Sequence, residues 1–123
     1  MNKKILIVDD EPNIVISLEY LMKKEGFQVA VANDGDAALA TMAEFLPDLV
    51  LLDVMMPKKS GYEVCQQMRA NPVLAGIKVV MLTAKGRESE IAKGMALGAD
   101  AYVTKPFSTK DLVIRVKSLL EPA

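Results

Sequence analysis

The sequence contains no histidine among its 123 residues. A histidine-based catalytic triad, a histidine metal ligand and a phosphohistidine are therefore excluded within this chain. The single cysteine, Cys65, cannot form an internal disulfide, which agrees with a reducing compartment. Cys65 shares one helical face with Val64 and Met68, so we expect a buried structural thiol. Any chemistry must therefore use carboxylates, hydroxyls and lysine.

The chain also lacks long apolar runs and a surplus of charge. Charges interrupt the apolar stretches well short of a membrane span, so we expect no membrane contact. Lys3 and Lys4 imitate the start of a signal peptide, but the apolar run that follows ends at Asp9. The net charge is −1 without a basic stripe, so we expect no direct contact with nucleic acid. We expect one cytoplasmic domain over residues 1–123.

Hydrophobic periodicity predicts strands that alternate with helices along the whole chain. The expected strands are 5–8, 28–32, 49–53, 78–82 and 101–104. The expected helices are 12–24, 34–46, 61–70, 88–97 and a last one that opens at Ser108 and Asp111, which have capping-box spacing. A parallel strand pair needs a crossover, and the crossovers here are helices. The pattern therefore predicts an α/β fold, a doubly wound parallel sheet with helices on both faces.

Polar residues stand where the expected strands end. Asp53 closes the apolar run Leu49–Leu52, and a charge in that place is costly to bury unless it is paired. The ends of other strands supply partners, namely Asp9, Asp10, Thr83 and Lys105. Sites in open parallel sheets lie beyond the carboxyl ends of the strands. The sequence thus predicts three carboxylates, a hydroxyl and an ammonium at one sheet edge.

Each of these residues has a simpler explanation when it is taken alone. An aspartate pair before a proline often caps a helix, and methionines usually pack against a core. A threonine, lysine or tyrosine near a strand end is often an ordinary surface or half-buried residue. These explanations apply to Asp9 and Asp10, to Met55 and Met56, and to Thr83, Lys105 and Tyr102. They would all have to hold at the same sheet edge, so the whole set favours a site.

Crowded carboxylates point to a bound cation. Two unit charges about 4 Å apart repel by roughly 4 kcal/mol at an effective dielectric near 20. Either one carboxylate takes a proton or a cation joins them. Oxygen ligands without histidine or cysteine favour a hard ion, and Mg²⁺ typically uses one or two carboxylates and leaves positions for water and phosphate. We therefore expect Mg²⁺ and phosphoryl chemistry with a carboxylate as the nucleophile.

Five segments, in this order and at this spacing, carry a family resemblance. They are Ile7–Glu11, Asp53–Pro57 with Gly61, Thr83–Ala84, Gly98–Asp100 and Lys105–Phe107. The chain resembles the receiver domain of two-component response regulators, and the resemblance covers essentially the whole chain. It implies the flavodoxin-like strand order 2-1-3-4-5 that this fold shares with the chemotaxis response regulator.

The resemblance also implies a role for each site residue. Asp53 would accept a phosphoryl group from a histidine on a partner sensor histidine kinase or phosphotransfer protein, which fits a chain without histidine. Asp10 and Asp53 would bind Mg²⁺ through their carboxylates, Met55 through its backbone carbonyl, and Asp9 through water. Such a domain assists its own phosphorylation and dephosphorylation but is not an enzyme in the ordinary sense.

Around the phosphoryl group the resemblance assigns two more residues. Lys105 would pair with the phosphoryl oxygens, and Thr83 would donate a hydrogen bond to one of them. Phosphorylation would draw Thr83 inward and turn Tyr102 into the vacated space, which would reshape the face made by helix 88–97, strand 101–104 and the last helix. A cis peptide bond between Lys105 and Pro106 is also implied.

Two further features follow from the resemblance. The residues two positions after the phosphoacceptor and after the threonine are Met55 and Lys85, and neither can orient an attacking water as a carboxylate or amide would, so we expect slow self-dephosphorylation. DNA-binding relatives dimerise through charges on this same face, made by helix 88–97, strand 101–104 and the last helix. This chain keeps four of those charges, Lys93, Asp100, Asp111 and Arg115, but has Ile91 and Ala101 where relatives commonly have others, so a homodimer is a hypothesis.

Three other classes of function have some support in the sequence. A haloacid-dehalogenase-type phosphatase needs a second acid two residues after its nucleophile, where this chain has Met55. A flavin-binding module needs a phosphate loop after the first strand, where Asp9–Glu11 would repel a phosphate. A receiver that only binds proteins, without phosphorylation, is the main alternative. Such domains usually lose one of the site residues, whereas this chain keeps them all.

Overall fold

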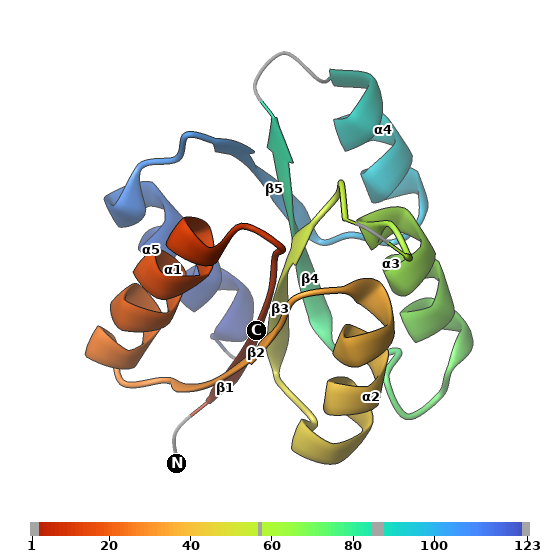
Figure 1. Ribbon diagram of the computed structural model, residues 1–123, viewed down its shortest axis with the longest axis horizontal. Helices are drawn as coiled ribbons and strands as arrows, with labels where there is room; N and C mark the ends of the chain where they lie inside the picture. The colour runs from red at the N-terminus through yellow and green to blue at the C-terminus, as the bar shows by residue number, and fades with distance from the viewer. Residues whose placement is uncertain (1–2, 57, 85–87, 122–123) are drawn as a thin grey trace.

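Five parallel strands form one sheet in the order β2-β1-β3-β4-β5 in the computed structural model (Figure 1), which describes residues 3–56, 58–84 and 88–121. The strands are β1 (Lys4–Val8), β2 (Gln28–Ala32), β3 (Leu49–Asp53), β4 (Lys78–Ala84) and β5 (Ala101–Lys105). The helices are α1 (Pro12–Lys24), α2 (Gly35–Phe45), α3 (Gly61–Ala70), α4 (Glu88–Ala96) and α5 (Thr109–Leu120). The predicted fold class, alternation and strand order are confirmed.

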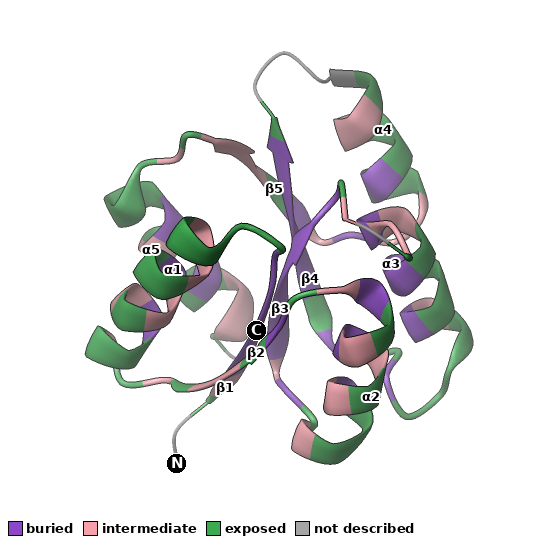
Figure 2. Cartoon of the chain, viewed as in Figure 1, coloured by how far each residue is buried: buried purple, intermediate pink, exposed green. Residues whose placement is uncertain are grey.

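The helices cover both faces of the sheet, α1 and α5 on one side and α2, α3 and α4 on the other (Figure 1). Alternate residues of each strand face opposite sides, so Ile5 and Ile7 pack toward α1 and α5 while Leu6 and Val8 pack toward α2 and α3. Figure 2 shows buried central strands and exposed outer helix surfaces. Burial on both faces explains why the strands are apolar at nearly every position.

Most element ends agree with the predictions, and the differences have local causes. Asp34 lies outside α2 because its side chain caps the helix, accepting a hydrogen bond from Ala37 N at 2.8 Å. Leu46 also lies outside α2, since its φ of 50° breaks the helical path. At α3 a reciprocal capping box joins Ser60 and Glu63, a signal that the sequence carries and that the predictions did not include.

The interpretation of Asp9 and Asp10 as a helix cap is wrong. Glu11 is the N-cap of α1, and no side chain in the described part of the chain caps that helix. Asp9 instead accepts a hydrogen bond from the backbone N–H of Glu11 through Oδ1 at 2.9 Å. The acidic pair is therefore available to a site at the sheet edge.

Strand β4 runs two residues beyond its predicted end. Its last two residues pair with the end of β5, Thr83 with Thr104 and Ala84 with Lys105. This pairing brings Thr83 and Lys105 to the same end of the sheet, one residue apart in register. The bond between Lys105 and Pro106 is cis, as the family resemblance implied.

Cys65 is fully buried, as predicted, and its thiol donates to the carbonyl of Leu97 with a sulfur-to-oxygen distance of 3.6 Å. Burial raises the pKa of this thiol, so it remains protonated at neutral pH. Within residues 3–56, 58–84 and 88–121, no helix has the length and hydropathy needed to cross a bilayer.

Candidate functional site

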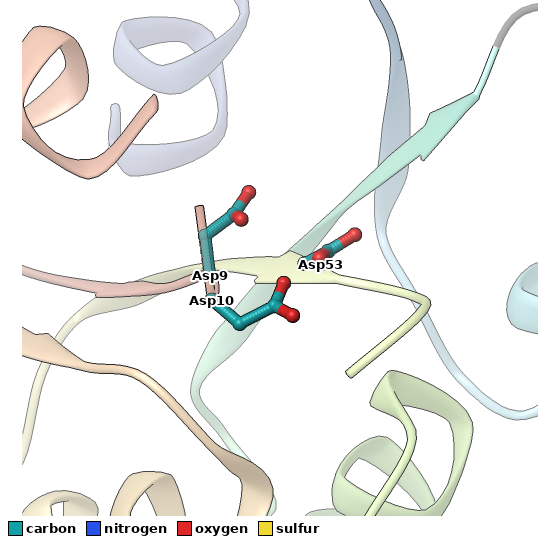
Figure 3. A group of neighbouring side chains, drawn as sticks. All are labelled: Asp9, Asp10 and Asp53. Carbon is teal, nitrogen blue, oxygen red and sulfur yellow. The ribbon is translucent and has the colours of Figure 1, made fainter. Parts of the chain in front are cut away.

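The candidate site lies where the strand order of the sheet reverses. From β1 the chain continues to β2 on one side, and β3 lies on the other side of β1. Asp9 and Asp10 directly follow β1, and Asp53 is the last residue of β3 (Figure 3). Because β1 and β3 are paired in parallel, their carboxyl ends meet at one edge. The predicted juxtaposition of the three aspartates is therefore present.

The three carboxylates form a compact group of oxygen donors. One oxygen from each of Asp9, Asp10 and Asp53 lies within 4.8 Å of the others. Asp9 is fully buried and Asp53 is 6% exposed, whereas Asp10 is open to solvent. An all-oxygen set with one exposed side fits a hard divalent cation that keeps part of its water shell. The donor chemistry thus fits the Mg²⁺ expected from the sequence.

Lys105 brings a positive charge into this group. Its Nζ lies 2.8 Å from Oδ2 of Asp9, 3.3 Å from Oε1 of Glu11 and 3.5 Å from Oδ1 of Asp53. Burial by itself lowers the pKa of Lys105, but the hydrogen bond to Asp9 and the nearby charge of Asp53 outweigh it, so the net shift is upward. Lys105 is therefore a cation held by the cluster, and its interpretation as a solvated surface lysine is wrong.

The carboxyl group of Asp53 has a strongly raised pKa. Burial raises its pKa to about 7, the charge of Asp9 adds to the increase, and the charge of Lys105 opposes it. The backbone N–H of Met55 donates a weak hydrogen bond to Oδ1 of Asp53 at 3.4 Å. Without a bound cation, Asp53 is then about half protonated near neutral pH. Binding of a cation would favour its ionised form.

Thr83 presents a buried hydroxyl to the same edge. The residue is 1% exposed, and its Oγ1 has no hydrogen-bond partner among the residues that the structure describes. A buried hydroxyl without a partner costs about 1–3 kcal/mol. A new acceptor oxygen beside Asp53 would relieve this cost. Thr83 is therefore more than an ordinary strand end.

A cavity of about 130 Å³ opens in front of Asp53, with Thr83 and Lys105 among its lining residues. Glu11 and Glu90 also line it, and the predicted site included neither. Glu11 continues the Asp9–Asp10 pair, so a signal existed for it. Glu90 belongs to α4, and no local pattern links that helix to the sheet edge.

The two methionines after Asp53 have different environments. Met56 packs against the core, as methionine usually does. Met55 is 67% exposed at the rim of the cavity, so the packing interpretation is wrong for it. Lys85, the other residue predicted to govern dephosphorylation, lies outside the described residues.

Asp100 and Lys93, two of the charges expected on the dimerisation face, interact with other side chains of the same chain. Nη2 of Arg69 donates to Oδ2 of Asp100 at 2.9 Å. Nζ of Lys93 lies over an aromatic ring of α3, 4.4 Å from its centroid. Asp111 and Arg115 instead line a surface cavity of about 340 Å³, together with the side chain of Tyr102, which is 40% exposed.

Together, the doubly wound sheet and its acidic edge define a class, the flavodoxin-like α/β proteins with a polar site at the strand ends. The family model for the response regulator receiver domain matches residues 5–117. The chain is 48% identical over 120 residues to the alkaline phosphatase synthesis transcriptional regulatory protein PhoP of Bacillus subtilis, covering 98% of this chain and 49% of the relative. It is 46% identical over 123 residues to the phosphate regulon transcriptional regulatory protein PhoB of Rhizobium meliloti, covering 100% of this chain and 54% of the relative.

Among solved structures, a putative response regulator from Chloroflexus aurantiacus superposes with a TM-score of 0.94 at 36% identity, covering 98% of both chains. The chain therefore belongs to the response regulator receiver domain family. Members of this family are phosphoacceptor signalling domains of two-component systems, phosphorylated by sensor kinases, and they generally use Mg²⁺ at an acidic pocket. The chain spans about half the length of the curated relatives that it matches.

Proposed function

We propose that Asp53 is the phosphoacceptor of this receiver domain. The observation that carries the proposal is its environment, in which a nearly buried carboxylate ends β3 beside a cation and in front of a cavity of about 130 Å³. Asp9 is fully buried and held by Lys105, and Asp10 faces the solvent. Asp53 is the aspartate that lines the cavity shared by Thr83 and Lys105.

In the proposed reaction, a carboxylate oxygen of Asp53 attacks the phosphorus of a phosphohistidine on a sensor kinase or phosphotransfer protein. The new P–O bond forms as the P–N bond breaks, and the imidazole leaves with its electron pair and takes up a proton. Nζ of Lys105 lies 3.5 Å from Oδ1 of Asp53 and would pair with the oxygens of the phosphoryl group that arrives there. The product is an acyl phosphate on Asp53.

The carboxylates of Asp10 and Asp53, the backbone carbonyl of Met55 and a water held by Asp9 would bind Mg²⁺. When bound, Mg²⁺ neutralises charge on the transferring phosphoryl group. The three aspartates supply the donor group within 4.8 Å, and the exposed position of Asp10 leaves a side open to water and phosphate. Binding of the cation would also release Lys105 from part of its interaction with Asp9.

Thr83 would link phosphorylation of Asp53 to a change in the α4-β5-α5 face. Its partnerless hydroxyl lines the same cavity as Asp53, so a phosphoryl oxygen would offer the acceptor that it lacks among the described residues. Tyr102 follows on β5, 40% exposed, and would turn toward the space that Thr83 leaves. The modification would thereby favour one of two arrangements of the α4-β5-α5 face, and a shift from 1:99 to 99:1 would need about 5.5 kcal/mol.

The test is the intact mass of the protein after incubation with a small phosphodonor, with Mg²⁺ or with chelator. We expect a gain of one phosphoryl group that requires Mg²⁺ and disappears in Asp53→Asn. The matched control is Asp111→Asn, which removes an exposed carboxylate from α5 and should be phosphorylated as the wild type is. Failure of a folded, Mg²⁺-binding wild type to gain mass would favour a receiver that binds proteins without phosphorylation.

Once formed, the acyl phosphate should persist. Met55 is exposed at the cavity rim but has no group that can orient water toward phosphorus. We expect slow loss of the phosphoryl group from the isolated domain and a faster loss in Met55→Asn, whose amide could position water. Both rates follow from mass spectra after removal of the phosphodonor. Loss within seconds from the wild type would contradict this expectation.

The phosphorylated α4-β5-α5 face is a candidate homodimer interface in the cytoplasm, with neither nucleic acid nor membrane contacting this domain. Asp111 and Arg115 are the charges available for pairing, because Asp100 is engaged by Arg69. Sedimentation of the phosphorylated domain tests this proposal. An unchanged sedimentation coefficient on phosphorylation would remove it, and so would a dimer that survives Arg115→Ala.

A further inference from the structure

The turn before α2 makes a close contact with the segment that follows β3, at Gly35 and Lys59. At Gly35, a Cβ atom would lie 2.4 Å from Cβ of Lys59, 2.8 Å from the Lys59 carbonyl oxygen and 3.1 Å from Val64. The atoms it would strike are backbone and the base of a side chain, so no flexible group can move aside. Only a glycine lets these two segments approach so closely.

Two ion pairs cross the same contact. Nζ of Lys58 lies 3.6 Å from Oδ2 of Asp34, and Nζ of Lys59 lies 3.0 Å from Oδ1 of Asp36. Asp34 is itself fixed, because its other oxygen caps α2. Each pair is partly exposed and contributes little to stability by itself. Together with the close contact at Gly35, the two ion pairs fix the position of the segment after β3 relative to the turn before α2.

The far end of the segment after β3 is also fixed. A Cβ at Gly61 would lie 2.4 Å from the carbonyl oxygen of Asp53 and 3.0 Å from Cα of Val54. The backbone N–H of Gly61 donates to the carbonyl of Val54 at 2.9 Å. The segment that carries Met55 is therefore held between the phosphoacceptor strand and the turn at Gly35.

We propose that Asp34, Gly35 and Asp36 are positioning residues for the metal site. Among the described residues, no hydrogen bond or ion pair joins them to Asp9, Asp10 or Asp53, and they act by fixing the backbone that presents the Met55 carbonyl. The inference rests on the proposed function, because that carbonyl matters only if the cation binds there. Residues that orient metal ligands in this indirect way typically change metal affinity 10- to 100-fold when they are altered.

The first test is Gly35→Ala, with Gly76→Ala as the matched control. Gly76 has nothing within 4 Å of its ideal Cβ, so the same chemical change there meets open space. Gly35 is the first residue of α2 and has no positive φ, so alanine suits the helix. The added methyl group therefore strains no helical backbone, and its conflict is with Lys59 and Val64 alone. If Gly35 served stability only, Gly35→Ala would lower the free energy of unfolding, but the folded protein would bind Mg²⁺ normally.

Backbone amide NMR gives both readouts, first without metal and then during a Mg²⁺ titration. We expect Gly35→Ala to shift the amide signals of residues 54–56 and 58–60 in the metal-free protein and to weaken Mg²⁺ binding about tenfold. Gly76→Ala should do neither. Urea unfolding of both variants checks that the difference is one of affinity and not of stability.

The ion pairs are tested by exchanging their charges. Asp36→Lys should weaken Mg²⁺ binding by at most about fivefold, since an exposed pair is worth up to about 1 kcal/mol. The double variant Asp36→Lys, Lys59→Asp keeps the net charge and should restore the affinity. Because salt screens exposed pairs, the gap between the single variant and the wild type should close in 1 M salt.

The outcomes separate this inference from the proposed function. If the wild type binds no Mg²⁺, the proposed metal site fails and the positioning role falls with it. If the wild type binds Mg²⁺ and Gly35→Ala binds it equally well, only the positioning role is overturned. Shifts confined to the turn before α2 in the metal-free spectrum would overturn it in the same way.

Discussion

Asp53→Asn should stabilise the metal-free protein above neutral pH. The folded state holds the pKa of Asp53 at about 7, against 3.8 for an ordinary aspartate, chiefly because the carboxyl is buried and lies beside the charge of Asp9. Between pH 4 and 7 the folded state therefore binds more protons than the unfolded state. The free energy of unfolding then falls as the pH rises through this window and levels off above it.

The size of the effect follows from the shift. A change of one pKa unit is worth about 1.4 kcal/mol, so the full shift corresponds to roughly 4 kcal/mol. Solvent at the open edge of the sheet screens part of this, and we expect about 2 kcal/mol at pH 8. Urea unfolding in chelator at several pH values measures it, for the wild type and Asp53→Asn. The difference should shrink toward pH 4.

The control is the same unfolding measurement in the presence of Mg²⁺. A bound cation stabilises the folded wild type by mass action, whereas Asp53→Asn has lost one carboxylate ligand and should gain less. Asp10→Asn, which removes a nearby charge from an exposed position, should move the pH window of the wild type downward. A metal-free wild type whose stability is flat between pH 4 and 8 would refute the reasoning, as would an Asp53→Asn variant less stable than the wild type at pH 8.

Three further variants test single contacts by urea unfolding in chelator. Lys105→Met leaves the buried charge of Asp9 without its partner at 2.8 Å and should cost about 3 kcal/mol; an unchanged stability would contradict the pairing. Thr83→Val removes a buried hydroxyl that has no partner among the described residues and should stabilise by about 1 kcal/mol, whereas a loss of stability would reveal an unrecognised bond. Arg69→Lys should lower the free energy of unfolding by roughly 2 kcal/mol, because lysine cannot reproduce the five hydrogen bonds of the guanidinium, two of them to the carbonyl of Gly98. An unchanged free energy of unfolding would show that these hydrogen bonds do not stabilise the fold.

The order and type of the elements could be predicted because each segment has an unambiguous period. The strands are short apolar runs, and α1 and α5 carry one apolar face each. The strand order was less accessible, because the period of a strand says nothing about its neighbour. It came from the family resemblance. The ends of α2 were missed by one residue on each side, since Asp34 and Leu46 are caps whose backbone only a structure reveals.

The candidate site could be anticipated because its members stand at strand ends, and strand ends converge in a parallel sheet. Two features could not. Glu90 reaches the cavity from α4, and its place depends on how that helix packs. The sequence suggests Asp100 as a surface charge for dimerisation, but it accepts hydrogen bonds from Arg69 and from the backbone of Val79. Those partners lie 31 and 21 residues away, so no local pattern could show them.

The pair between Lys105 and Asp9 joins residues 96 positions apart. Together with Asp53 and Thr83, these residues come from the ends of four neighbouring strands. A chain that has folded only its first half has the aspartates in place but lacks the ammonium of Lys105 and the hydroxyl of Thr83. A chain whose last strand has detached loses the lysine and exposes the buried charge of Asp9. Phosphorylation therefore requires the complete fold, and nascent or partly unfolded copies of the chain should not accept a phosphoryl group.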